Sequence, residues 1–217
     1  MNEVRYRTPD TLGWLEATLN EEEIAYLWNR IENKKSGREL FDKGRYDDTN
    51  SRSSYKLVDA GHYFFNDVLL PLCKYYEDQF GSRAKRLPTS NKHPLRLEYW
   101  WVNYQNEGDY LPIHNHGGVY SFAIWLNVPT EHDEQKRIAE NSNNINASNF
   151  AFHYQNILGE PASYVYEMGK KMEGEMVFFP SELSHAVYSY FECKEQRISI
   201  SGNIDLDTSK ILHDEGN

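Results

Sequence analysis

The sequence predicts an α+β protein, mainly β, in which N-terminal helices support a β-sandwich or barrel. Two observations predict this class. Hydrophobic residues recur at helical spacing before residue 81 and at a spacing of two from Leu95 onward. In addition, 14% of the residues are aromatic, which favours strands and pocket walls with a polar edge. Because helices come first and strands later, we expect one domain over residues 1–217.

The first predicted helix runs from about Glu21 to Asn33. Asn20 can cap its N-terminus, and Glu23 stands in the capping-box position three residues later. Acidic side chains in the first turn also interact favourably with the helix dipole. We expect residues 1–20 before this helix, and residues 34–54 after it, to be irregular.

The second predicted helix runs from about Ala60 to Phe80 and presents an apolar stripe. Gly81 is a plausible stop signal for it. Pro71 lies inside the helix, where it predicts a kink or a split. Residues 1–94 are therefore expected to be mainly helical support for the β core.

The predicted β core covers residues 95–204. Its expected strands are Leu95–Val102, Val119–Val128, Ala162–Glu167, Glu175–Phe179, Ala186–Phe191 and Gln196–Ile204. Residues 130–156 are polar and rich in Asn, so we expect a surface insertion there. We interpret Glu131–Gln155 within it as a lid or substrate loop.

Composition excludes several classes of function. The formal charge of −10, from 23 Lys and Arg against 33 Asp and Glu, argues against a binder of duplex nucleic acid. Two Cys cannot make a disulfide scaffold or a four-thiolate zinc site. No apolar run approaches the ~18 residues of a membrane span, and residues 1–7 resemble no secretory signal. We expect a cytoplasmic protein without a membrane partner; the sequence does not indicate its oligomeric state.

His114 and His116 form the first candidate motif. In an extended chain, residues two apart point to the same face, so the two imidazoles can converge on one metal ion. Taken alone, the pair is equally well explained as two surface histidines in a turn before Gly117. His185 follows a buried-looking strand and a proline turn, where a single histidine more often bonds to the backbone.

Arg197 and Ser199 lie on one face of a predicted strand, while Ile198 and Ile200 face the core. An arginine projecting from a barrel strand is costly unless it meets an anion, and a carboxylate suits its planar fork. A protein carboxylate could equally be its partner. Together with the three histidines, the simplest account is a mononuclear metal site beside a carboxylate-binding arginine.

At this point the sequence resembles a known superfamily. Residues 104–116 look like the metal-binding segment of 2-oxoglutarate/Fe(II)-dependent oxygenases, most of all prolyl 4-hydroxylases and related oxygenases of bacteria and tailed phages. In those families a Tyr precedes the first metal-binding His by ten residues with a Gly between them, and Tyr104 and Gly108 match. Residues 121–127 resemble the next core strand.

The resemblance continues to the end of the predicted core. Residues 174–180 with His185 resemble the strand and turn that supply the distal histidine. Arg197-Ile198-Ser199 resembles the Arg-x-Ser element that binds the far carboxylate of 2-oxoglutarate. The match covers roughly Leu95–Ile204, and it implies a double-stranded β-helix, which is a distorted jelly roll.

What the resemblance implies about chemistry is specific. Fe(II), with 2-oxoglutarate and O2 as co-substrates and ascorbate as reductant, would hydroxylate a substrate and release succinate and CO2. His114, His116 and His185 would bind the metal. Tyr104, Arg197 and Ser199 would bind 2-oxoglutarate. The expected substrate is a prolyl or other amino-acid side chain of a protein or peptide; free amino acids and nucleotides stay open. For a phage-encoded chain the compartment would be the host cytoplasm.

The sequence departs from the family pattern at one position. The usual facial triad is His-x-Asp/Glu with a distant His, and here the carboxylate position is His116. Either His116 ligates, or an acid elsewhere does, with Asp109 nearest in sequence, or water takes the position with His116 beside it. We favour ligation, because relatives of this type often show His-x-His.

Two other functions fit the same residues. A cupin-like three-His metalloprotein would need the histidines but not Arg197. A non-catalytic β-sandwich binding module would need neither. Trp101, Trp125 and Tyr120 are candidate walls of the site, although ordinary core packing explains each of them as well.

Overall fold

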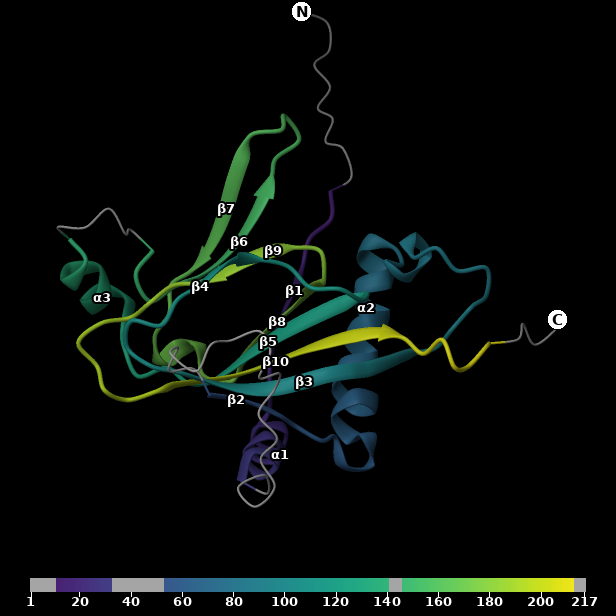
Figure 1. Cartoon of the computed structure of the whole chain (residues 1–217), viewed down its shortest axis with the longest axis horizontal. Helices are drawn as coiled ribbons and strands as arrows, with labels where there is room; N and C mark the ends of the chain where they lie inside the picture. The colour runs from purple at the N-terminus through teal and green to yellow at the C-terminus, as the bar shows by residue number, and fades with distance from the viewer. Residues whose placement is uncertain (1–10, 33–52, 141–145, 213–217) are drawn as a thin grey trace, which may run out of the picture.

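The computed structural model describes residues 11–32, 53–140 and 146–212. Two antiparallel sheets face each other, and helices α1 and α2 lie against the outer side of the larger sheet (Figure 1). This arrangement is the mainly β jelly roll with helical support that the sequence predicts. Among the described residues, no helix combines the length and the apolar character needed to cross a membrane.

The larger sheet has six strands in the order β1-β8-β5-β10-β3-β2. In that order they are Leu15–Thr18, Glu175–Pro180, Tyr120–Asn127, Arg197–Leu206, Leu95–Gln105 and Ser53–Lys56. Strand β10 lies at the centre, pairs with β5 on one side and pairs with β3 on the other. The N-terminal region therefore contributes both edge strands, β1 and β2, in addition to helices.

The smaller sheet has four strands in the order β4-β9-β6-β7. They are Leu111–His114, Ser184–Val187, Phe150–Gln155 and Pro161–Tyr166. The pairing of β4 with β9 contains an irregularity in register and places His114 directly opposite His185. Two histidines that are 71 positions apart in the chain thus become cross-strand neighbours.

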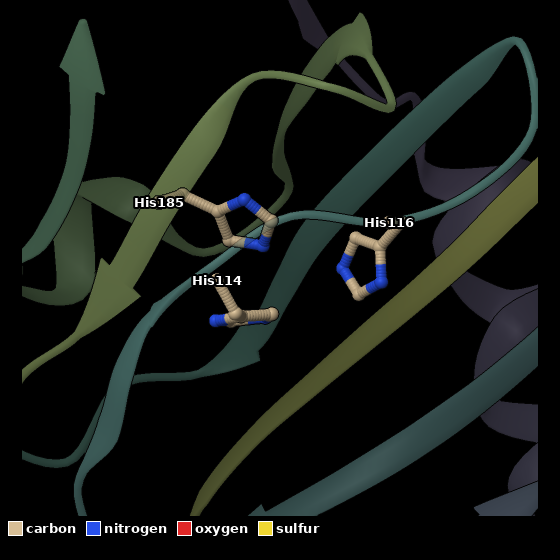
Figure 2. Close-up of side chains that lie close together, drawn as sticks. All are labelled: His114, His116 and His185. Carbon is tan, nitrogen blue, oxygen red and sulfur yellow. The ribbon is translucent and has the colours of Figure 1, made fainter.

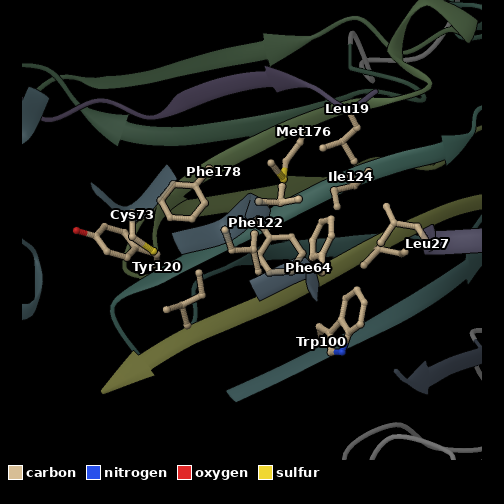
Figure 3. Packing of buried hydrophobic residues seen from close by; sticks show 14 of the residues in the cluster. Leu19, Leu27, Phe64, Cys73, Trp100, Tyr120, Phe122, Ile124, Met176 and Phe178 are labelled. Carbon is tan, nitrogen blue, oxygen red and sulfur yellow. The ribbon is translucent and has the colours of Figure 1, made fainter. Parts of the chain in front are cut away.

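Strand alternation divides the buried side chains into two layers. On the outer face of the larger sheet, Trp100, Phe122 and Phe178 pack with helical residues such as Leu27 and Phe64 (Figure 3). A second layer fills the space between the two sheets. Its members are Ala123, Trp125, Val128, Phe150, Phe152, Tyr166, Met168, Val177 and Phe179.

Helix α1 spans Glu21–Glu32 and begins as the sequence predicts. The side chain of Asn20 accepts the N–H of Glu23 at 2.9 Å, and the Glu23 carboxylate accepts the N–H of Asn20 at 2.8 Å. This reciprocal pair satisfies two backbone donors that the first turn would leave unpaired.

The second predicted helix changes geometry along its length: the helix breaks at Gly61 and His62, and π-helical geometry gives way to α-helical geometry next to Pro71. A 3₁₀ turn at Ala60–His62 is followed by a π-helical segment at Phe64–Leu69 and by α2 at Leu70–Phe80. Pro71 stands in the first turn of α2, where the missing N–H costs no helical hydrogen bond. Gly81 ends α2 with a φ of +79°.

Several sequence-based expectations about irregular segments are wrong. Residues 1–20 include β1, and residues 130–156 include helix α3 at His132–Ile138 and the buried strand β6. Most of the predicted loop 34–54, and residues 141–145 of the insertion, lie outside the described residues.

The described part of segment 130–156 belongs in part to the β core, and the expected role of Glu131–Gln155 as a lid or substrate loop stays a prediction. Its strand β6 is an interior strand of the smaller sheet and pairs with both β9 and β7. The strand predicted at Ala186–Phe191 starts two residues earlier and ends at Val187.

Candidate metal centre and anion site

Three histidines converge at the edge of the smaller sheet. His114 ends β4, His116 follows it in the loop to β5, and His185 lies on β9. One nitrogen from each ring lies within 4.8 Å of the other two. Figure 2 shows the three imidazoles turned toward one another. Among the described residues this group contains no carboxylate; Asp109 instead accepts the N–H of Asn106 at 2.8 Å in the turn after β3.

Backbone carbonyls orient two of the three rings. His114 Nδ1 lies 2.8 Å from the carbonyl oxygen of Pro112, and His185 Nδ1 lies 3.0 Å from that of Leu183. A carbonyl can only accept, so Nδ1 carries the proton and Nε2 is left with its lone pair. The protein thus presents two Nε2 atoms in the form that a metal requires.

Burial keeps two of the three rings neutral. Desolvation, with a further contribution from His114, lowers the pKa of His116 to about 4 and that of His185 to about 3. Both rings are therefore uncharged at neutral pH. Neutral imidazole is the ligating form, so no proton has to be displaced from them when a cation binds.

Aromatic side chains enclose His185. The rings of Phe150, Phe152 and Phe179 lie 5.6, 6.3 and 5.1 Å from its ring, centre to centre. Trp101 meets His116 edge-on at 6.1 Å. These contacts restrict access of water from the side of the sheets and raise the strength of electrostatic interactions inside.

The three predicted wall residues take different positions. Trp101 lies against the cluster, as predicted. Trp125 packs between the sheets, against Phe150. Tyr120 lies on the outer face of β5, where it contacts Tyr76, so its assignment as a wall of the site is wrong.

Arg197 faces the inside of the jelly roll. Along β10, Ile198, Ile200 and Ile204 belong to the outer layer, so Arg197 and Ser199 project between the sheets, as the sequence predicts. Only 1% of Arg197 is exposed. Burial lowers the pKa of its guanidinium to about 10, which leaves it charged at neutral pH.

No carboxylate neutralises this charge within the described part of the chain. Arg197 donates to the Gln105 side chain at 3.3 Å and to the carbonyl and hydroxyl of Ser148 at 2.7 and 2.6 Å. Its plane lies over the ring of Tyr190, 5.3 Å from the centroid. Its Nε donor is buried without any partner in the described residues. A buried cation with an unused donor is the signature of a site for an anion.

Tyr104 is not brought to this site. It stands opposite Ile198 across β3 and β10 and packs on the outer layer, with its ring 5.9 Å from that of Tyr55. Its neighbours Asn103 and Gln105 have the inward positions, because side chains alternate along a strand. The structure therefore does not bring Tyr104 to Arg197, whereas Ser199 lies on the same face of β10 as Arg197.

Sequence reasoning missed the residues that surround Arg197. Gln105 could have been found, because it lies at an inward position of a predicted strand if that strand is extended by three residues. Ser148 and Thr130 carry no signal in the sequence, since they flank a polar Asn-rich stretch. Only the fold brings them to the guanidinium.

The donor set fits a divalent transition metal. Three imidazole ligands suit Fe, Zn, Ni or Cu and are a poor choice for Mg or Ca. Nitrogens bound to one ion at roughly 2.1 Å each lie at most about 4.2 Å apart, so a small approach of the rings completes the site. One jelly roll thus offers a metal position and an arginine that has no carboxylate partner in the part of the chain that the structure describes.

Comparison with known proteins agrees with this chemistry. Residues 99–203 match the model of a family described as "Putative 2OG-Fe(II) oxygenase". This segment contains all three histidines, Arg197 and Ser199. The resemblance to 2-oxoglutarate/Fe(II)-dependent oxygenases is therefore confirmed. No curated protein matches the chain.

Solved structures of low sequence identity share the fold. A prolyl-4-hydroxylase from Pseudomonas putida is 14% identical with a TM-score of 0.52, over 88% of this chain and 92% of its own. A Trichoplax adhaerens prolyl hydroxylase in complex with a peptide of hypoxia inducible factor is 11% identical with a TM-score of 0.56, over 89% and 83%. HygX from Streptomyces hygroscopicus, with nickel and 2-oxoglutarate bound, is 12% identical with a TM-score of 0.53, over 92% and 85%.

Proposed function

We propose that this protein, whose residues 99–203 match a family of 2OG-Fe(II) oxygenases, is a 2-oxoglutarate- and Fe(II)-dependent dioxygenase that hydroxylates its substrate. One observation carries the proposal. A cluster of three imidazoles and a buried arginine without a carboxylate partner among the described residues occur in the same jelly roll. A metal-binding protein of another kind has no need for the second feature.

In this proposal His114 and His185 bind the metal through Nε2, and His116 is the third ligand. When bound, Fe(II) supplies the redox chemistry that couples O2 reduction and decarboxylation of 2-oxoglutarate to hydroxylation, with succinate and CO2 as the other products. The three imidazoles contribute no negative charge. The cation therefore keeps its full charge for a dianionic co-substrate.

The chain's other residues bind and orient the co-substrate. Arg197 receives the distal carboxylate of 2-oxoglutarate on its unused Nε side, in a charge-assisted hydrogen bond. The hydroxyl of Ser199, two residues along the same face of β10, can donate a further one. Phe150, Phe152 and Phe179 keep water away from the ring of His185.

The test is turnover of 2-oxoglutarate. Purified protein supplied with Fe(II), ascorbate and O2 is expected to form succinate, and protein loaded with Mn(II) is expected to bind 2-oxoglutarate. Arg197→Lys keeps the charge but loses the fork, so affinity for 2-oxoglutarate should fall about tenfold or more. Arg86→Lys, at an exposed arginine paired with Glu182, is the matched control. Metal binding without 2-oxoglutarate binding would reject the proposal.

The second candidate is a cupin-like three-His metalloprotein that does not use 2-oxoglutarate. The absence of a carboxylate from the described histidine cluster favours it. The two functions differ at Arg197. If Arg197→Lys leaves metal-dependent oxygen consumption unchanged, the second function is correct.

We propose an amino-acid side chain of a protein or peptide as the substrate. The support is fold similarity to two prolyl hydroxylases, one of them holding a peptide. Synthetic proline-containing peptides, free amino acids and nucleotides can be compared by the succinate each releases above the background rate. Mass spectrometry should then show one added oxygen on the peptide that stimulates turnover. Stimulation by free amino acids or nucleotides alone would contradict this choice.

A further inference from the structure

Ser148 has an unusual backbone conformation in the interior of the protein. It precedes β6, is fully buried, and has a φ of +69°. This left-handed region is unfavourable for a residue with a Cβ and is usually taken by glycine. Its N–H donates to the carbonyl of Ser189 at 2.7 Å, which holds the turn in place. A serine in place of glycine in such a conformation points to a role for its polar atoms.

The conformation aims two oxygens at one nitrogen. Nη2 of Arg197 donates to the Ser148 carbonyl at 2.7 Å and to its hydroxyl at 2.6 Å. The hydroxyl of Thr130, which is also buried, lies 3.0 Å from that of Ser148. Ser148, supported by Thr130, thus holds one corner of the guanidinium.

Two further residues fix the rest of the guanidinium. Gln105 accepts from Nη1 and is itself anchored through Nε2 on the carbonyl of Asp109 at 2.8 Å. Tyr190 lies beneath the plane, and its hydroxyl lies within hydrogen-bonding distance of the carbonyls of Gln105 and Glu195. Nε is the donor that remains unused within the described structure.

We propose that Ser148 is a positioning residue that sets the direction of the Arg197 Nε donor for the distal carboxylate of the co-substrate. This inference rests on the proposed function. It assigns to Ser148, with the support of Thr130, a role in co-substrate binding. Because the guanidinium is planar, a hold on Nη2 fixes where Nε points.

A purely structural role makes a different prediction. If Ser148 only satisfies a buried arginine, its loss changes the stability of the protein and leaves the affinity of folded protein for 2-oxoglutarate unchanged. If it positions Nε, affinity falls in protein that is still folded. Measuring the affinity of the folded variant for 2-oxoglutarate therefore distinguishes the two roles.

The variant Ser148→Gly provides this measurement. Glycine accepts the positive φ, so the backbone carbonyl stays in place while the hydroxyl is lost. We expect 2-oxoglutarate to bind about tenfold more weakly to the Mn(II)-loaded protein by calorimetry, with Mn(II) affinity unchanged. In turnover, KM for 2-oxoglutarate should rise while kcat stays constant. Thr130→Val, which removes the support of the hydroxyl, should give a smaller change in the same direction.

His62→Gly is the matched control. His62 is exposed and has a φ of +57°, so the substitution relieves the same backbone conformation far from Arg197. It should leave 2-oxoglutarate affinity unchanged. The Nε–H resonance of Arg197 in 15N NMR spectra, assigned by its loss in Arg197→Lys, gives a readout without co-substrate. It should move in Ser148→Gly and not in His62→Gly.

The outcomes are distinct. Equal 2-oxoglutarate affinity of wild type and Ser148→Gly, with an unmoved Arg197 resonance, would overturn the inference and leave the proposed function intact. Failure of the wild type itself to bind 2-oxoglutarate would reject the proposed function. Should Ser148→Gly not fold, the affinity and resonance of Thr130→Val decide between the two roles.

Discussion

His114 and His185 are cross-strand partners on β4 and β9, and their ring centres lie 4.2 Å apart. Each ring makes the same local contact, from Nδ1 to the carbonyl two residues earlier in the chain. The two rings are therefore oriented for metal binding in the metal-free protein. Strand pairing sets the distance between the rings, and the two carbonyls set their tautomer. His116 has no such contact among the described residues.

Removal of either paired histidine should abolish tight metal binding. His114→Ala or His185→Ala leaves one oriented imidazole and His116, too few ligands for a stable site. Metal content after dialysis, measured by elemental analysis, should fall from about one ion per chain to near zero. His93→Ala serves as the control. His93 is not part of the histidine cluster, and its Nδ1 lies 2.6 Å from the backbone carbonyl oxygen of Lys210, so this variant should retain the metal. Full metal content in His185→Ala would contradict the assignment.

The variant His116→Asp should still bind the metal but should bind 2-oxoglutarate more weakly. The aspartate restores the two-His, one-carboxylate ligand set and lowers the charge of the centre by one unit. Attraction of the dianionic co-substrate then decreases, and we expect its dissociation constant to rise roughly tenfold, equal to about 1.4 kcal/mol. Calorimetry on Mn(II)-loaded protein measures it. Tighter binding in the variant would show that the charge of the site does not govern co-substrate affinity.

The metal-free protein should lose stability as pH falls below the ordinary histidine range. Burial lowers the pKa of His116 to about 4, whereas the unfolded chain has a value near 6.5. The unfolded state therefore takes up the proton first. Stability from this group is complete above about pH 6.5 and declines as pH falls toward 4.

Denaturant unfolding from pH 7 to 4 tests this dependence. The variant His116→Gln removes the titrating group, so its unfolding free energy should fall less steeply over the same interval. The difference between the two proteins gives the contribution of His116 alone, because carboxylates that titrate in the same pH range contribute equally to both. Parallel profiles would show that burial of His116 does not oppose its protonation.

Tyr104→Phe should leave 2-oxoglutarate affinity unchanged. The hydroxyl lies on the outer layer, on the face of β3 opposite Gln105. Calorimetry and the KM for 2-oxoglutarate measure the effect, beside Arg197→Lys as the variant that does change. A loss of tenfold in Tyr104→Phe would restore the role that the sequence resemblance predicts for this tyrosine.

Gly202→Ala should destabilise the protein by about 1–3 kcal/mol. A Cβ at this position of β10 would lie 2.5 Å from the ring of Phe122 and 2.8 Å from Cβ of Trp100, in the packed outer layer. Urea unfolding measures the change. Gly117→Ala is the control, because a Cβ there meets nothing within 4 Å and the φ is not positive. Equal stability of the two variants would mean that Phe122 and Trp100 can shift to make room for the added Cβ without loss of stability.

Local chemistry made much of the fold predictable. Asn20 and Glu23 predict the start of α1 because capping depends on residues three apart. The alternation of Arg197, Ile198 and Ser199 predicts which of them face inward, because a strand has a fixed period of two. The two histidines at 114 and 116 predict a metal site for the same reason of local geometry.

Contacts between distant segments were beyond such reasoning. Tyr104 fits the family spacing, yet the register of β3 turns it outward, and register depends on pairing with β10. Strand β6 was missed because the Asn-rich stretch before it dominates the composition, although Phe150 and Phe152 alternate as strand residues do. Ser148 reaches Arg197 only through tertiary structure.

The edge strands β1 and β2 determine how the chain can be shortened. They lie outside the matched residues 99–203, as do α1 and α2. A fragment cut at those boundaries would bare the hydrogen-bonding groups of β8 and β3 and uncover Phe122 and Phe178 to water, inviting self-association. The residues that match the family model are therefore fewer than the residues that the fold needs. A shortened protein for crystallisation or binding measurements should keep β1, β2, α1 and α2.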